Sequence, residues 1–351
     1  VVFLNLCACY GYASSRIKLN FDFDWKFSLT DHPGYAAIDY SDANWEQVQL
    51  PHDWNIKQKF DRKGIGSAAY LPEGIGWYRK TFFVPQSYKG RTVSILFDGI
   101  FQQSDVYING KHLGHRPYGF CSIEYDLTPY LHTGKENVIA VRVNTTGGRP
   151  RWYAGAGIYR HVWLTAANPV HVATYGTYIT TPEATEDHAD VKIVTTVSNQ
   201  SDKEQAITVT QRLIDDSGKE VARGKKGHLL IKAGNTADVE QIVPVASPRL
   251  WTLENPVMYT METTVKVNNR VTDVYLLDAD GNRRELEDDK LYRVVADLYS
   301  GQMLSAVTKT SYGLLSVVPK KADGTPIEDF EDVILTDNGG ELKAWTAIAH
   351  Y

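Results

Sequence analysis

The sequence predicts an all-β protein with a jelly-roll sandwich, an immunoglobulin-like sandwich and a small truncated α+β tail. Short segments alternate apolar and polar residues, turn signals separate them, and no long helical period occurs before residue 272. A period of two is typical of strands that bury one face against a core. The expected parts are a signal-peptide remnant (1–16), the jelly roll (17–169), the immunoglobulin-like sandwich (170–272) and the tail (273–351).

The first sandwich is predicted from several short strands. Residues 91–97, 137–143 and 158–164 are β-forming segments. Residues 104–114 contain Asn109-Gly110 between two β-forming runs, a strong signal for a two-residue hairpin turn. About 150 residues of this kind predict a jelly roll or related sandwich.

The second sandwich is predicted from similar alternation. Val191, Ile193, Thr195 and Val197 fall on one face of a strand, and residues 207–213 alternate next. About 100 residues with regular short strands indicate an immunoglobulin-like sandwich. This segment contains no cysteine pair, so it is not the antibody type.

Composition excludes several classes of protein. The net charge of −5 excludes a strongly basic nucleic-acid binder, and 43% hydrophobic residues exclude a disordered chain. No run reaches the roughly 18 apolar residues of a membrane span. The three cysteines form no disulfide framework or metal motif. We therefore expect no metal, no cofactor, no nucleic-acid partner and no membrane span.

The beginning of the chain resembles a targeting segment. Residues 1–9 are apolar, and small and polar residues follow, as at the end of a secretory signal. We therefore expect an exported bacterial protein that is periplasmic, cell-surface or extracellular. Residues 6–9 also have lipobox-like spacing, which would place a lipid anchor on Cys9. A buried N-terminal strand is the remaining alternative.

Candidate catalytic and metal residues are few. The sequence has no GxSxG elbow and no local Cys-His signature. His112 and His115 are three apart on a predicted strand, so we expect them on opposite faces and predict no metal pair. Residues 278–289 begin like a calcium loop but have Asp289 where the final Glu belongs, which favours a turn.

Aromatic and arginine residues gather at residues 74–80 and 149–160. Aromatic planes can stack on the C–H faces of sugar rings, while arginine can bind sugar hydroxyls. The alternative is structural: these residues would form an aromatic wedge in the core between two β-domains.

Four motifs together resemble the N-terminal part of glycoside hydrolase family 2, the β-galactosidase and β-glucuronidase family. The resemblance covers about residues 17–272, and the motifs keep the family's order and approximate spacing. They are Leu50-Pro-His-Asp-Trp-Asn-Ile56, Gly74-Ile-Gly-Trp-Tyr-Arg-Lys-Thr-Phe82, Asp105-Val-Tyr-Ile-Asn-Gly-Lys111 and Arg151-Trp-Tyr-Ala-Gly-Ala-Gly-Ile-Tyr-Arg-His-Val-Trp-Leu164.

The resemblance implies a sugar-binding jelly roll, an immunoglobulin-like domain and then a barrel that holds the family's two catalytic Glu residues. A barrel needs roughly 250 residues, and only 79 follow residue 272. The resemblance therefore predicts a non-catalytic accessory portion of a retaining, β-galactosidase-like enzyme, and no residue is assigned as catalytic. The alternative is a carbohydrate-binding module with weak β-galactoside affinity.

The family's loop before Gly-Ile-Tyr-Arg approaches the sugar, so the resemblance implies that Arg151, Trp152 and Tyr153 contact carbohydrate. The loop at residues 61–73 is expected to border the same site. His52, Asp53 and Trp54 are interpreted as structural, with Asp53 accepting backbone hydrogen bonds and Trp54 in the core. The expected partner is a β-galactoside or related glycoside, and homo-oligomer formation is a further expectation.

The tail has a different character. Residues 273–351 hold 15 acidic and 8 basic residues, a net charge of −7, whereas the preceding residues carry +2. Residues 291–304 and 311–320 resemble the C-terminal domain of bacterial 5′-nucleotidase-type metallophosphoesterases, which implies a nucleotide-binding tail as a third hypothesis. A natural fusion, a truncation with a rearranged tail and a joining error each explain the change near residue 273.

Overall fold

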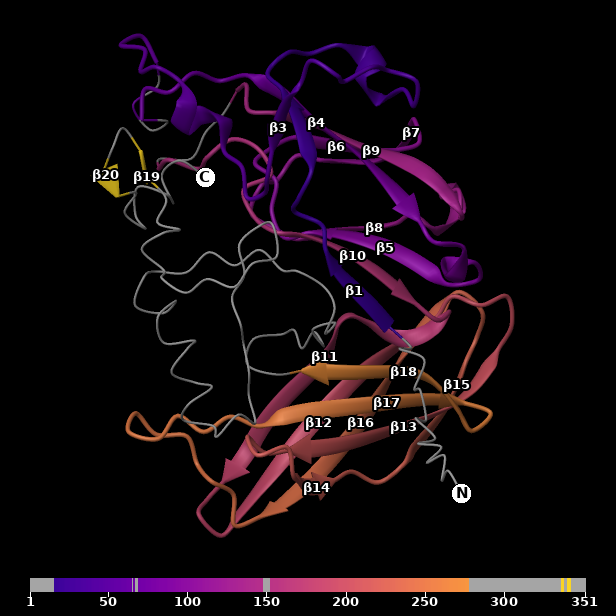
Figure 1. Ribbon diagram of the computed structural model, residues 1–351. Helices are drawn as coiled ribbons and strands as arrows, with labels where there is room; N and C mark the ends of the chain where they lie inside the picture. The colour runs from indigo at the N-terminus through magenta and orange to yellow at the C-terminus, as the bar shows by residue number, and fades with distance from the viewer. Residues whose placement is uncertain are drawn as a thin grey trace, which may run out of the picture. The chain divides into compact units, whose positions relative to one another are not determined.

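The computed structural model describes residues 16–64, 66, 69–147, 152–277, 336–337 and 340–341. The chain divides into two units, residues 1–283 and 284–351. The described part of the first unit consists of two β-sandwiches, confirming the all-β prediction (Figure 1). In the second unit, β19 (Thr336–Asp337) and β20 (Gly340–Glu341) form an antiparallel pair. The expectations for the leader and for the fold of the tail otherwise lie outside the described residues.

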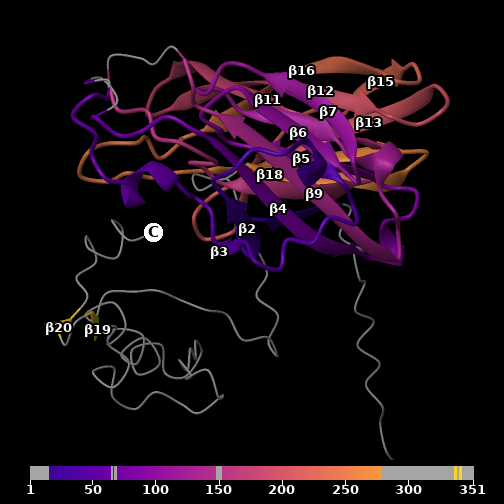
Figure 2. The same ribbon diagram turned by 90° about the horizontal axis from the view of Figure 1, so that it is seen from above.

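The first sandwich is built from two antiparallel sheets. One sheet has the order β1 (Arg16–Asn20), β10 (Val162–Ala167), β5 (Thr92–Phe97) and β8 (Ile123–Asp126). The other has the order β3 (Glu46–Val48), β2 (Trp25–Ser28), β4 (Ile75–Val84), β9 (Lys135–Asn144), β6 (Ser104–Ile108) and β7 (Lys111–Arg116), which can be followed in Figure 2. Short 3₁₀ helices occur at Pro33–Ala36, Trp54–Lys57, Gln86–Tyr88 and Thr128–Tyr130.

The apolar faces of both sheets form one continuous core. The predicted alternation at residues 91–97 becomes β5, whose Val93, Ile95 and Phe97 are almost completely buried. On the facing sheet, β9 contributes Ile139, Val141 and Val143 to the same core. Burial of these side chains is the main favourable contribution to the stability of this sandwich.

The hairpin predicted around Asn109-Gly110 is confirmed. Both residues have positive φ angles, 48° and 78°, as a type I′ turn requires. The expected orientation of the two histidines on this hairpin is wrong. The pairing shifts between Val106 and Tyr107, and this irregularity interrupts the simple alternation of β7. His112 Nε2 and His115 Nδ1 consequently lie 2.9 and 3.1 Å from the same Asp105 Oδ1.

The second sandwich packs two further antiparallel sheets. The first contains β11 (Val170–Ala184), β12 (His188–Asn199) and β16 (Asn235–Ala246) in that order. The second has the order β14 (Glu220–Arg223), β13 (Gln205–Ile214), β17 (Thr260–Val267) and β18 (Arg270–Leu277), with β15 (Gly227–Ile231) also paired to β13. The predicted inward face of β12 is confirmed by the burial of Val191, Ile193, Thr195 and Val197.

A buried ion pair joins the two sandwiches. Arg16 of β1 donates from Nε and Nη2 to the two carboxylate oxygens of Asp273 on β18, at 3.2 and 2.9 Å. The Asp273 side chain is fully buried and also accepts the backbone N–H of Val172 at 2.8 Å. Arg16 additionally donates to the carbonyl oxygen of Val172. Through Asp273, β18 is bound to the first sandwich. The strand ends at Leu277, beyond residue 272, at which the sequence predicts the end of this domain.

We expect the Asp273→Leu substitution to lower the free energy of unfolding by about 3–5 kcal/mol, because the buried Arg16 guanidinium loses the carboxylate that neutralises its charge. The paired Arg16→Met, Asp273→Leu variant should recover part of this loss, since no unpaired charge then remains. Urea unfolding followed by tryptophan fluorescence measures both. An Arg249→Met variant, which breaks the exposed pair with Asp216, is the control. Equal stability of the single and double variants would contradict the buried-charge explanation.

Candidate functional site

Three loops are tied together by backbone hydrogen bonds at one end of the first sandwich. The N–H of His52 donates to the oxygen of Ile158 at 2.8 Å, linking residues 50–57 to the loop before β10. Phe101 and Gly157 exchange a pair of N–H to O bonds, each 2.9 Å long. The loop that was predicted to contact sugar, which includes Trp152 and Gly157, is therefore held on two sides by main-chain hydrogen bonds.

The Asp53 side chain is the polar centre of this loop cluster. Its Oδ1 accepts the backbone N–H groups of Asn55 and Ala156 at 2.9 and 3.0 Å. Its Oδ2 accepts the hydroxyl of Tyr153. Trp54 is only 2% exposed. The structural interpretation of Asp53 and Trp54 is confirmed, and Asp53 also holds a predicted site residue in place.

The Gly155-Ala-Gly157 run has a steric explanation. Gly157 has φ +125°, and a Cβ atom there would lie 2.2 Å from Tyr78 Oη and 2.7 Å from the carbonyl oxygen of His52. A side chain at this position would therefore push the loop away from the buried wall beneath it. The loop lies close to the core because its residue at 157 has no side chain.

The loop presents its aromatic residues to solvent. Trp152 is 59% exposed and Tyr153 is 38% exposed. Arg151 lies outside the described residues. The structure thus places two of the three predicted sugar-contacting side chains next to each other on the surface, and their role in binding stays a prediction. Gly147, earlier in the same connection between β9 and β10, donates its N–H to Glu73 at 3.1 Å. This connection therefore contacts the end of the loop at residues 61–73, whose place beside a sugar site stays a prediction.

The other aromatic and arginine segment, residues 74–80, is part of the core. Trp77, Tyr78 and Arg79 on β4 are each no more than 2% exposed. The sugar-contact interpretation of this segment is therefore wrong, because the side chains are covered. The structural alternative, an aromatic wedge in the core, applies to this segment, but the wedge lies within the first sandwich and not between the two sandwiches. The buried guanidinium of Arg79 is satisfied by the carbonyl oxygens of Tyr35, Ala37 and Tyr40 and by the carboxylate of Asp42.

Two exposed aromatic residues beside Trp152 were not selected from the sequence. Tyr118 is 63% and Phe120 40% exposed, and the centroid of the Phe120 ring lies 6.0 Å from that of Trp152. Two aromatic residues flanking Gly119 just beyond the second arm of a hairpin are the signal that could have identified them. Because Phe120 is far from Trp152 in the sequence, the contact between their rings cannot be read from the sequence.

His52 is buried against the core under this loop. Its Nδ1 lies 2.8 Å from Tyr78 Oη, and Nε2 has no hydrogen-bond partner among the described residues. Burial away from water lowers the pKa of His52 to about 4, with the positive charge of Lys57 a smaller cause. Burial likewise raises the pKa of Tyr78 well above 10. Both groups are therefore neutral at pH 7 and act as part of the packing.

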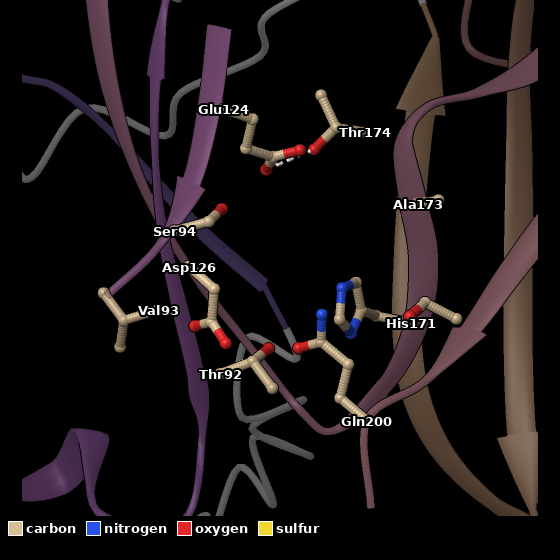
Figure 3. A pocket seen from close by; sticks show the side chains of 10 residues that line it. Thr92, Val93, Ser94, Glu124, Asp126, His171, Ala173, Thr174 and Gln200 are labelled. Atoms are coloured by element: carbon tan, nitrogen blue, oxygen red, sulfur yellow. Dashed lines mark hydrogen bonds between the residues drawn. The ribbon is translucent and has the colours of Figure 1, made fainter. Parts of the chain in front are cut away.

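A polar crevice of about 200 Å³ lies at the joint between the two sandwiches (Figure 3). The Thr174 hydroxyl and the Glu124 carboxylate are 2.7 Å apart across it, and His171 Nδ1 lies 2.7 Å from the carbonyl oxygen of Asn168. Burial lowers the pKa of His171. Because the Thr174 hydroxyl binds the Glu124 carboxylate across the joint, we interpret the crevice as a seam between the sandwiches. Its other lining residues include Thr92, Ser94, Asp126, Ser198 and Gln200.

Two further kinds of site were sought in the described part of the chain. No group of three or more His, Cys, Asp or Glu side chains there is arranged to hold a metal ion. Within the same residues, no helix has the length and apolar character needed to cross a membrane.

Comparison with known proteins gives a consistent result. A family model described as the sugar-binding domain of glycosyl hydrolases family 2 matches residues 18–168, and a second model of family 2 matches residues 170–278. The chain is 41% identical over 276 residues to the β-galactosidase BoGH2A of Bacteroides ovatus, covering 78% of this chain and 32% of that protein. It is 34% identical over 287 residues to a β-glucuronidase of Formosa agariphila, covering 75% and 29%.

The fold agrees with a solved structure as well. A family 2 member from Bacteroides cellulosilyticus superposes with a TM-score of 0.71 at 32% identity, over 74% of this chain and 35% of that one. The two successive antiparallel sandwiches correspond to the sugar-binding domain and the following domain of this family. The chain belongs to glycosyl hydrolase family 2. It spans about a third of the length of these relatives and carries their N-terminal domains, and none of its described residues forms part of a catalytic barrel.

His52 should make stability depend on pH. The unfolded side chain binds a proton near pH 6.5 and the folded one near 4, so acid favours the unfolded state. Above pH 6.5 we expect His52 to contribute nothing to the change of the free energy of unfolding with pH. As pH falls from 6.5 through 4, the free energy of unfolding should decrease by about 3 kcal/mol. Urea unfolding across this range should show a smaller slope for His52→Gln, whereas exposed His112→Gln serves as the control. Identical slopes for all three proteins would refute this assignment.

Asp53 should stabilise the loop cluster through its three hydrogen bonds. We expect Asp53→Ala to lower the free energy of unfolding by about 2–3 kcal/mol, because two backbone N–H groups and the Tyr153 hydroxyl lose a charged acceptor. Asp53→Asn retains an Oδ1 acceptor for the two N–H groups and should lose less than half as much. Denaturant unfolding measures both variants, and an Asn variant as unstable as the Ala variant would disprove the backbone-acceptor role.

Proposed function

We propose that this chain is the accessory N-terminal portion of a retaining β-glycosidase that acts on β-galactosides or related glycosides. In this proposal the catalytic carboxylates belong to a separate barrel domain, and the sandwiches contribute a wall of the sugar site. The similarity to a β-galactosidase and to β-glucuronidases supports the reaction class but leaves the sugar open between these two.

The observation that carries the proposal is the loop at residues 152–158. Its backbone is fixed by main-chain bonds and by Asp53, while its Trp152 ring is 59% exposed. A rigid loop with an exposed aromatic plane can stack on the C–H face of a sugar at a low cost in ordering. Arg151, next in sequence, would supply hydrogen-bond donors to hydroxyl or carboxylate groups of the sugar.

Further features of the whole protein belong to the same proposal. The apolar residues 1–9 favour export from a bacterial cell, with a lipid anchor on Cys9 as one form of it, and a buried N-terminal strand is the alternative. Exposed apolar side chains such as Leu253 and Leu230 would suit contacts with other domains or with a second copy. A carbohydrate-binding module without catalytic function and a nucleotide-binding tail remain the alternative hypotheses.

The test is titration calorimetry of the chain with methyl β-D-galactoside and, separately, methyl β-D-glucuronide. One of them should bind weakly, and Trp152→Ala should weaken binding by about tenfold, because truncating an aromatic anchor costs about 1–2 kcal/mol. Trp251→Ala, which removes a similarly exposed Trp from the second sandwich, should leave binding unchanged. Absence of binding heat for both sugars, or equal effects of the two variants, would reject the loop as a sugar site.

A further inference from the structure

Three exposed aromatic side chains meet beside the predicted sugar loop. We call Tyr118, Phe120 and Trp152 the aromatic corner. The Phe120 ring is central: its centroid lies 6.0 Å from that of Trp152, with the planes tilted by 41°, and 5.7 Å from that of Tyr118, with the planes at 72°. Phe120 therefore lies between Trp152 and Tyr118, and the three rings are in series on the surface.

The loop that carries Tyr118 and Phe120 is held in place from below. Phe120 packs on the buried Phe101 ring, with centroids 5.3 Å apart. The Tyr159 hydroxyl donates to the carbonyl oxygen of Gly119 at 2.9 Å. A Cβ atom at Gly119 would lie 2.6 Å from the Phe101 ring, so the loop and this ring are in close contact. The Phe120 ring and the backbone at Gly119 are thus held in place before any partner binds, which reduces the entropy lost on binding.

The two loops of the corner also share an anchor. Phe101, under Phe120, is paired through its backbone to Gly157, in the same loop as Trp152. Trp152 and Phe120 therefore keep their relative position although they are 32 residues apart in the sequence. The rings of Trp152 and Phe120 are 6.0 Å apart, which is comparable to the spacing of successive units in an oligosaccharide, so two linked units can each contact one ring.

We propose that Tyr118 and Phe120 of the aromatic corner bind a saccharide unit additional to the one contacted by Trp152 and Tyr153. The chain would then bind β-galacto-oligosaccharides more tightly than simple β-galactosides. The exposed side chains of the corner are all aromatic, and planar rings match the C–H faces of sugars, whereas hydroxyl groups at the edges can bind the Tyr118 phenol or water. This inference rests on the proposed function, because it extends the same carbohydrate site.

The test uses a series of increasing length: methyl β-D-galactoside, lactose and β-1,4-galactotriose, titrated into the full chain by calorimetry. We expect galactotriose to bind about tenfold more tightly than the monosaccharide glycoside, since the additional unit gains contact with an aromatic anchor. Tyr118→Ala and Phe120→Leu should abolish most of this gain and leave methyl β-D-galactoside binding within about twofold. Phe120→Leu keeps an apolar contact with Phe101, so its fold should persist.

The control is Tyr178→Ala, which removes a 67% exposed ring from β11 of the second sandwich and should preserve the gain with length. Binding of methyl β-D-galactoside without a gain for galactotriose would overturn the corner and leave the proposed function standing. Failure of every saccharide in this series to bind would overturn the inference, and the proposed function would be overturned with it only where methyl β-D-glucuronide also fails to bind. If Tyr118→Ala and Phe120→Leu change self-association in light scattering while the gain with length persists, the corner is a protein-docking surface and the inference is wrong.

Discussion

The close contact between the loop at residues 152–158 and the wall formed by residues 52–54 is the constraint on which the candidate site depends. Gly157 allows it, because any side chain there would overlap Tyr78 and the backbone of His52. Asp53 completes it by accepting two backbone N–H groups and the Tyr153 hydroxyl. Because the backbone is fixed in this way, the position of Trp152 is set by its loop, although most of its side chain is exposed.

Buried polar groups perform a similar task elsewhere in the chain. Arg79 is fully covered, yet its guanidinium binds carbonyl oxygens and Asp42, so its charge fixes the loop after β2 against the sheet. The pair between Arg16 and Asp273 connects the sandwiches in the same manner. Buried charges contribute little net stability when they are paired but cost much when one partner is lost. They therefore specify how loops and sandwiches meet, while apolar burial supplies most of the stability.

Aromatic side chains divide between these two tasks according to their place in the fold. Trp77 and Tyr78 lie on a central strand between neighbours on both sides, so the sheet and the core cover them. Trp152, Tyr118 and Phe120 lie on loops beyond the strand ends, where a large part of each side chain is exposed to water. The buried and the exposed set both consist of aromatic residues. Only their position in the fold makes the first set structural and leaves the second available to a ligand.

The sequence by itself determined the two sandwiches, the Asn109-Gly110 turn and the family, because strand alternation, turn chemistry and motif order are local properties of the chain. It also identified the backbone-accepting role of Asp53. The tertiary structure alone decided which aromatic segment is exposed and brought Phe120 to Trp152. It also placed His112 and His115 on the same carboxylate, since an irregularity in strand pairing interrupts the alternation that the sequence predicts. Contacts between distant loops and shifts of register depend on packing across the sandwich, which no short stretch of sequence contains.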